Sequence, residues 1–273
     1  MTELLTEFFS YSFIIRAVIV GGLVSLCAAL LGVILVLKRY SMLGDGLSHV
    51  GFGALAVAAV LNLAPLPVSV IVVITAAFLL LRLSEKSGLR GDALTALVSS
   101  SAIAIGITAA SLTTGLNTDV YNYMFGSIFA MSDTDVIISA VLSTVVVLLF
   151  AIFYNRIFTV TFDGDFASAT GVKVGFYNSL TAVLTAVTVV IGMRIMGTLL
   201  ISSLIIFPAL TSMRLFKSFK AVTVSSAVIS VICFFIGIFS SYAFNIPAGA
   251  SIVLVNLSAF IIFSAVSALK KRT

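Results

Sequence analysis

Charged side chains are scarce in this sequence, in which Asp, Glu, Lys and Arg together make up 9% of 273 residues. A soluble domain carries roughly 25% charged residues, so this chain has too few to cover a water-facing surface. Hydrophobic residues make up 61%, and the mean hydropathy is +1.27. The composition therefore excludes an ordinary soluble globular protein.

Cysteine is also rare. Cys27 and Cys233 lie far apart within apolar runs, without a C-x-x-C spacing, so we interpret them as small buried hydrophobic residues that say little about redox compartment. The G-x-x-x-x-G-K-[ST] loop is absent, which excludes ATP hydrolysis by the usual P-loop route within this chain. No segment is long enough to form an external ligand-capturing domain. A transporter built on this chain would take its energy and its ligand receptor from other chains, or its energy from an ion gradient.

Apolar runs of about 20 residues recur along the chain, which is the length that crosses a bilayer as a helix. Lipid cannot hydrogen-bond free backbone groups, and the runs are too long and uniform for barrel strands. We predict an all-α, polytopic membrane protein with nine crossings, eight or ten being the alternatives, in a single transmembrane domain over 1–273. Residues 118–131 form a polar segment that could contain a short re-entrant helix. The predicted spans lie near 11–37, 44–63, 66–83, 94–115, 136–153, 177–193, 197–216, 221–241 and 248–268.

Lys and Arg collect in alternate connections between the predicted spans. If the N-terminus is outside, 13 of the 15 cations fall on the cytoplasmic side, and only Arg16 and Arg194 fall on the outer side. Because short cytoplasmic loops collect Lys and Arg, we predict an N-out, C-in topology. The net charge of +5 then reflects topology, and nothing indicates nucleic-acid binding. The outer connections carry acidic residues instead: Glu3, Glu7, Asp119, Asp133 and Asp135.

One pair of ionisable residues lies within the second predicted span, where Asp45 precedes His49, the single histidine of the chain, by four residues. On a helix this spacing places both side chains on one face and within reach of each other. A carboxylate and an imidazole make half of a coordination sphere for Zn²⁺, Mn²⁺ or Fe²⁺, and an incomplete shell suits an ion that must be released. Two alternatives remain open: a structural pair near the interface, a few residues beyond Arg39, or a proton relay.

The longest cytoplasmic connection, residues 154–178, contains a short amphipathic core over 162–170, followed by Gly171 as a typical helix C-cap. Phe162 and Phe166 are four residues apart, which predicts a single apolar face. A short helix of this kind suits docking in a partner's groove, and a linker without a partner fits the same length. Two acidic residues in it are expected to be solvated or to meet basic groups of a partner: Asp163 and Asp165.

Four stretches, in order from about 40 to 216, each match a short motif. They are "YSMLGDGLSHVGFGALA", similar to a D-A-L-S-H-type segment; "YMFGSIFAMSDTDV", similar to an F-G-S-[IL]-L segment; "FDGDFASATGVKV", similar to a D-x-x-x-A-x-x-x-G-V loop; and "GTLLISSLIIFPALTSMRL", similar to a G-x-L-L segment with P-A. Together, in this order, they resemble the membrane subunits of ABC transporters for zinc, manganese and iron, the ABC-3 type. Gly46 is a minor departure, since the family often has Ala there.

The resemblance implies a permease subunit in the bacterial plasma membrane, with the type II importer fold of vitamin B12 and siderophore importers. The implied partners are two ATPase subunits, a second permease copy (the same or a related chain), an extracellular metal-binding protein and membrane lipid. Asp45 and His49 match the family's metal-pathway residues, and 162–171, within a coupling loop of about 155–176, matches its coupling helix. The implied ATPase-coupling residues are Phe162, Asp163, Asp165, Phe166, Ala167 and Gly171.

The resemblance also implies that the subunit is not itself an enzyme and holds no permanent cofactor, because the metal ion is its substrate. Two other functions are kept as alternatives. One is a proton-coupled secondary metal transporter that uses Asp45 and His49 as a relay, without an ATPase. The other is a permease for a chelate such as haem or a siderophore, for which an Asp–His pair would not be required. Asp plus His suits Zn²⁺, Mn²⁺ and Fe²⁺ alike, so the residues do not select the metal.

Overall fold

The computed structural model describes residues 7–86, 91–112, 128 and 131–270. In this part of the chain every regular element is a helix, and nine helices are long and apolar enough to cross a membrane, which confirms the nine predicted spans. The predicted re-entrant segment at 118–131 lies almost entirely outside the described residues. The helices are α2 (Ser12–Leu37), α3 (Leu43–Val60), α4 (Pro65–Lys86), α5 (Gly91–Ser111), α7 (Asp133–Phe162), α8 (Gly164–Ala169), α9 (Val174–Met196), α10 (Thr198–Leu215), α11 (Phe219–Phe244) and α12 (Ala248–Lys270).

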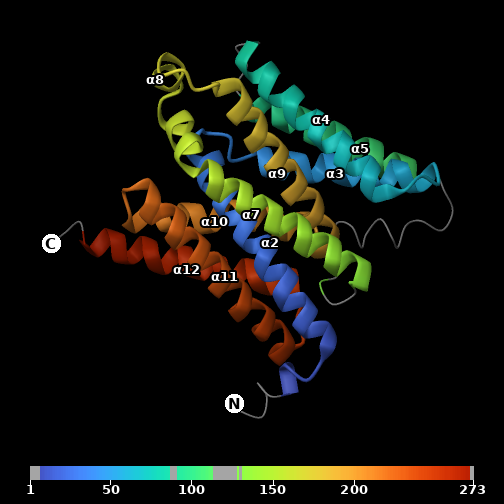
Figure 1. Cartoon of the computed structure of the whole chain (residues 1–273). Coiled ribbons are helices and arrows are strands. Elements are labelled where there is room, and N and C mark those ends of the chain that lie inside the picture. The colour runs from blue at the N-terminus through green and yellow to red at the C-terminus, as the bar shows by residue number, and fades with distance from the viewer. Residues whose placement is uncertain (1–6, 87–90, 113–127, 129–130, 271–273) are drawn as a thin grey trace.

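The helices form three groups (Figure 1). α3, α4 and α5 pack together on one side, α10, α11 and α12 on the other, and α2, α7 and α9 lie between them. α2 contacts α7, α9, α10 and α11. In its most apolar stretch of 18 residues 78% of the residues are buried, whereas in the corresponding stretch of α12 only 11% are. α2 is therefore a core helix, whereas α12 and the similarly exposed α4, α5 and α7 present apolar surface outward.

Glycine lets α3 approach its neighbours at backbone distance. A Cβ built on Gly53 would lie 2.5 Å from the carbonyl oxygen of Ala102 in α5, so only a hydrogen fits between the two helices. A Cβ on Gly44 would come within 2.6 Å of the Ile205 side chain in α10. α3, the helix that carries Asp45 and His49, is thus held closely between α5 and α10.

The largest departure from the predicted spans is at the end of α7, which continues to Phe162 instead of ending near 153. Asp163, with φ −149° and ψ 92°, interrupts the helix, and its Oδ1 accepts a hydrogen bond from the Phe166 amide at 2.8 Å. This cap starts α8, a separate six-residue helix. Gly171 follows α8 with φ +81°, a conformation that favours glycine and ends the helix. Residues 155–162 of the predicted loop are therefore the last two turns of α7.

Candidate functional site

Asp45 and His49 both lie on α3, in its first two turns, and the structure brings their side chains to one face as the spacing predicted. His49 Nε2 lies 3.7 Å from Asp45 Oδ1, which is too long for a hydrogen bond. The two side chains are partly accessible, with 23% of His49 and 37% of Asp45 exposed. The backbone around them is buried, since Gly44, Gly46 and Ser48 are all buried. The pair therefore sits on an open edge of an otherwise tightly packed helix.

Ser202 of α10 completes this arrangement, and the sequence did not single it out. Its Oγ lies 2.8 Å from Asp45 Oδ1 and 2.9 Å from the Thr198 carbonyl oxygen, so its hydroxyl proton can be donated to the carboxylate. Asp45 lies in the first turn of α3, and Ser202 lies in the second turn of α10. The beginnings of two helices that are far apart in the sequence thus meet at Asp45.

The separation of Asp45 Oδ1 and His49 Nε2 is close to the separation that one bound cation would need. Oxygen and nitrogen ligands lie at about 2.0–2.2 Å from Zn²⁺, and two tetrahedral positions are then about 3.4 Å apart. The observed 3.7 Å between Asp45 Oδ1 and His49 Nε2 exceeds this by a few tenths of an ångström, which a small side-chain adjustment covers. Among the described residues, no group of three or more His, Cys, Asp or Glu side chains converges anywhere. The site therefore offers two strong ligands and one hydroxyl, an incomplete shell.

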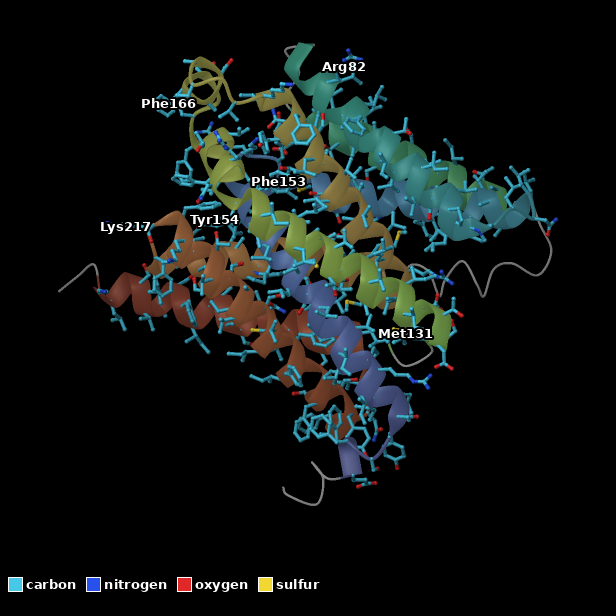
Figure 2. The ribbon with its side chains drawn as sticks, in the orientation of Figure 1. Arg82, Met131, Phe153, Tyr154, Phe166 and Lys217 are labelled. Carbon is cyan, nitrogen blue, oxygen red and sulfur yellow. The ribbon has the colours of Figure 1, made fainter. Side chains whose placement is uncertain are left out.

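The predicted coupling residues fall on two helices instead of one. Phe162 ends α7, and its ring packs against Phe158 and Phe219, with centroids 5.0 and 5.9 Å away. Phe166 lies on α8 at the end of the molecule, 58% exposed (Figure 2). The predicted single apolar face shared by Phe162 and Phe166 is therefore wrong, because the turn at Asp163 separates them. The sequence did contain a signal for this break, because Asp163, four residues before Ala167, is a good N-cap residue.

α8 is fixed to α7 and α9 by a small apolar cluster. Ala167 is fully buried and packs with Val160 of α7 and Val172 of the following turn. Phe166 and Asp165 remain on the outer side of α8, and both are exposed. The helix thus turns an aromatic ring and a carboxylate outward while its inner side is packed. Aromatic residues, phenylalanine included, are enriched in the cores of protein–protein interfaces.

The other end of α7 is held by charges. Asp133 pairs with Arg16 of α2, and Asp135 Oδ1 lies 2.8 Å from the guanidinium of Arg194 in α9. Ser132 forms a capping box with Asp135, so the same carboxylate also helps to start the helix. Arg16 and Arg194 are the two cations that the predicted topology places on the outer side. Each of them has an acidic partner, which reduces the cost of its position.

Comparisons with known proteins agree with this arrangement. Residues 10–267 match the ABC 3 transport family. The chain is 28% identical over 260 residues to the manganese import system permease protein ScaB of Streptococcus gordonii, covering 95% of this chain and 93% of that protein. It is 25% identical over 252 residues to the high-affinity zinc uptake system membrane protein ZnuB of Haemophilus influenzae, covering 92% and 97%.

A solved structure is similar over nearly the whole chain. PsaBC from Streptococcus pneumoniae, in complex with Fab, superposes with a TM-score of 0.85 and 30% sequence identity, covering 96% of this chain and 94% of that chain. The arrangement of the helices is therefore one already seen in a solved structure.

Proposed function

Because this chain belongs to the ABC 3 transport family, we propose that it is the membrane permease subunit of an ATP-driven importer of divalent transition-metal ions. Its relatives are described as manganese import and zinc uptake permeases, so Mn²⁺ and Zn²⁺ are the proposed substrates, with Fe²⁺ as a third ion that the same ligands suit. The comparisons do not favour a proton-coupled secondary transporter or a chelate permease.

The Asp45–His49 pair carries this proposal. Its 3.7 Å separation of ligand atoms and its incomplete shell suit a cation that is bound briefly and then released. Ser202 orients the carboxylate by donating a hydrogen bond to Oδ1, and the second lone pair of this oxygen stays available to an ion shared with His49 Nε2. In the proposed transport cycle the ion reaches this pair from an extracellular metal-binding protein and leaves toward the cytoplasm.

A second permease copy is proposed to complete the pathway. α5 packs on α3, and its exposed side combines small side chains, which membrane helices use where they contact another helix closely, with the large residues Leu97, Ile105 and Ile107. The exposed face of α7 carries mainly large branched side chains, which suit lipid. The small exposed residues of α5 are Ala93, Ala96, Ser100, Ser101, Ala104 and Ser111.

Two separate ATPase subunits are proposed to drive the cycle through α8, one on each permease copy. The exposed ring of Phe166 would enter a groove of the ATPase, and Asp165 would meet basic groups beside it. α8 follows α7 and precedes α9, so closure of the ATPases would move these two helices relative to α3. The distribution of charge supports the N-out, C-in topology, since Arg156 and Lys173 lie beside the turn that follows α8, and Arg82 lies at the same end of the molecule (Figure 2).

The test is uptake by vesicles that contain this chain together with its ATPase and metal-binding protein. Uptake of Mn²⁺ or Zn²⁺ should require ATP on the α8 side and should persist when a protonophore removes the proton gradient. Uptake that stops with the protonophore and ignores ATP would support the relay transporter instead. A preference for haem or a siderophore over free Mn²⁺ and Zn²⁺ would support the chelate permease.

A further inference from the structure

A hollow of about 410 Å³ lies where α7 ends and α9 begins, on the same end of the molecule as α8. Its size is within the range of small-molecule sites in proteins. The wall contains two cations and two aromatic rings but no acidic residue. The lining residues are Arg156, Gly171, Val172, Lys173, Phe176 and Tyr177.

The two cations of this hollow have no acidic partner in the described part of the chain. Arg16 and Arg194, at the opposite end, each form an ion pair, whereas the structure records none for Arg156 or Lys173. Asp163, seven residues after Arg156, uses its carboxylate to cap α8, and Asp165, eight residues before Lys173, lies on the exposed side of that helix and in none of the recorded ion pairs. The first turn of α9 also contains no acidic residue. The hollow therefore presents uncompensated positive charge.

Arg156 continues the outermost face of α7. That face consists of five large apolar residues at helical spacing, between 43% and 70% exposed, and Arg156 follows the last of them by four residues. Membrane helices that contact other helices use small residues, so this stripe of large branched side chains suits contact with lipid chains. The five residues are Ile137, Val141, Val145, Leu148 and Ile152. The guanidinium thus stands where lipid tails end and headgroups begin.

The aromatic side chains define the same level. Phe176 is 54% exposed, and its ring packs edge-on against Phe153 and Tyr177, with centroids 6.4 and 5.2 Å away. Aromatic rings gather at the headgroup level of a bilayer, and basic pockets between helices on the cytoplasmic side hold anionic headgroups. Figure 2 shows Phe153 on the α7 side of this region.

We propose that this hollow binds the phosphate of an anionic phospholipid, with Arg156 and Lys173 on the headgroup and Phe176 against the beginning of an acyl chain. An apolar wall that runs directly into the stripe of α7 favours a lipid over a soluble anion. The bound lipid would sit between α7 and α9, beside α8, and would therefore stabilise the helices that are proposed to carry the movement of the ATPase.

The chain contains no tryptophan, so Phe176→Trp creates a single indole in the hollow. The full-length variant is reconstituted in phosphatidylcholine vesicles that contain a brominated lipid, whose bromines quench a nearby indole. Brominated phosphatidylglycerol is expected to quench far more strongly than brominated phosphatidylcholine at equal content. Phe244→Trp provides the matched position, because Phe244 is 74% exposed at the opposite end and should show no such preference.

Removing the cations should remove the preference. One Lys or Arg near the surface contributes roughly fivefold to the affinity for anionic lipid, so Arg156→Ala and Lys173→Ala should each lower the relative affinity by about that factor. Lys217→Ala should leave it unchanged, since Lys217 lies in the turn between α10 and α11, outside the hollow (Figure 2). Arg156→Lys should retain most of it, because the charge is kept.

Three results would overturn the proposal. Equal quenching by the two brominated lipids would show that the hollow does not select an anionic headgroup. Quenching by phosphatidylglycerol that millimolar inorganic phosphate abolishes would assign the cations to a soluble anion. If the Arg156→Ala/Lys173→Ala double variant keeps the lipid preference but no longer retains the ATPase, the hollow belongs to the surface that contacts the ATPase.

Discussion

The Asp45–His49 pair and α8 are built in opposite ways. The pair lies on a helix whose neighbours approach at backbone distance, with Ser202 of α10 holding the carboxylate. α8 has six residues, packs against α7 and α9, and shows an exposed Phe166 on its outer side. One region fixes the position of its polar side chains by packing on several sides. The other offers an apolar side chain that the described chain leaves uncovered.

This difference matches the roles proposed for the two regions, metal binding for the pair and coupling to the ATPase for α8. A ligand pair must keep its geometry within a few tenths of an ångström, which the dense packing around α3 provides. A docking helix must move with the partner that covers it, and a short helix with one packed side and one free side allows that. Changes in the two regions should therefore fail in different assays, and the following variants test whether they do.

The largest effect is expected from the ligand pair itself. Asp45→Asn removes the charge that attracts a divalent cation, and His49→Ala removes the only imidazole of the chain. Either change should lower metal uptake by more than about 100-fold, the upper range for losing a residue that merely supports a ligand. Uptake of ⁵⁴Mn²⁺ or ⁶⁵Zn²⁺ by vesicles measures this. Both variants should still insert and retain the ATPase, and normal uptake by both would remove the pair from the transport path.

Phe166→Ala should produce the complementary loss. Truncating an aromatic anchor at the centre of an interface costs about 2 kcal/mol or more, so binding of the ATPase should weaken by roughly 30-fold. Co-purification of the ATPase and ATP-driven uptake should both fall, while metal binding to the detergent-purified permease should be unchanged. Phe244→Ala, at the opposite end, is the matched exposed phenylalanine and should retain the ATPase. Full assembly and uptake by Phe166→Ala would mean that α8 is only a connection between spans.

Ser202→Ala tests how far the Asp45–His49 pair depends on its supporting hydrogen bond. Loss of a group that orients a metal ligand typically costs 10- to 100-fold, and we expect about 10-fold weaker metal binding here because Asp45 keeps its charge. Ser203→Ala is the control, since Ser203 Oγ donates to the Leu200 carbonyl and does not touch Asp45. Equal effects of the two substitutions on metal binding would show that Ser202 acts only through packing of α10.

The sequence predicted what depends on local spacing. Nine spans follow from hydropathy alone, and the shared face of Asp45 and His49 follows from a separation of four residues on a helix. The resemblance to metal permeases was likewise carried by short motifs, and the comparisons confirm it. The roles of Asp45, His49 and α8 remain predictions.

Contacts between distant segments could not be predicted in this way. Ser202 reaches Asp45 across 157 residues, and no periodicity of either segment indicates that their helices overlap there. The break at Asp163 was missed for a related reason: the apolar pattern continues through Phe158 and Phe162 into Phe166, and only the capping bond divides it. The ion pairs at the start of α7 could have been predicted, because the predicted topology places all four of their residues on the same side of the membrane. These residues are Arg16, Arg194, Asp133 and Asp135.

The ion pairs Arg16–Asp133 and Arg194–Asp135 are expected to give the smallest effects. They hold the end of α7 that lies farthest from α8, so they test whether a change far from α8 leaves binding of the ATPase intact. Asp135 is 18% exposed and Arg194 35%, whereas Asp133 is 75% and Arg16 42% exposed. Solvent screens the Arg16–Asp133 pair more than the Arg194–Asp135 pair. A double-mutant cycle with Asp135→Asn and Arg194→Gln should therefore give a coupling of about 1 kcal/mol or more. Asp133→Asn with Arg16→Gln should give about 0.2–1 kcal/mol, decreasing with salt.

Unfolding is followed with a thiol-reactive dye, because Cys27 and Cys233 are both buried and become accessible only when the helices separate. If the two pairs only hold the far end of α7, these variants lose stability while binding of the ATPase through Phe166 is unchanged. The ranking would be contradicted if the Arg16–Asp133 cycle gave the larger coupling. The separation of the two regions would be contradicted if neutralising Asp135 weakened ATPase binding as much as Phe166→Ala does, because the far end of α7 would then set the position of α8.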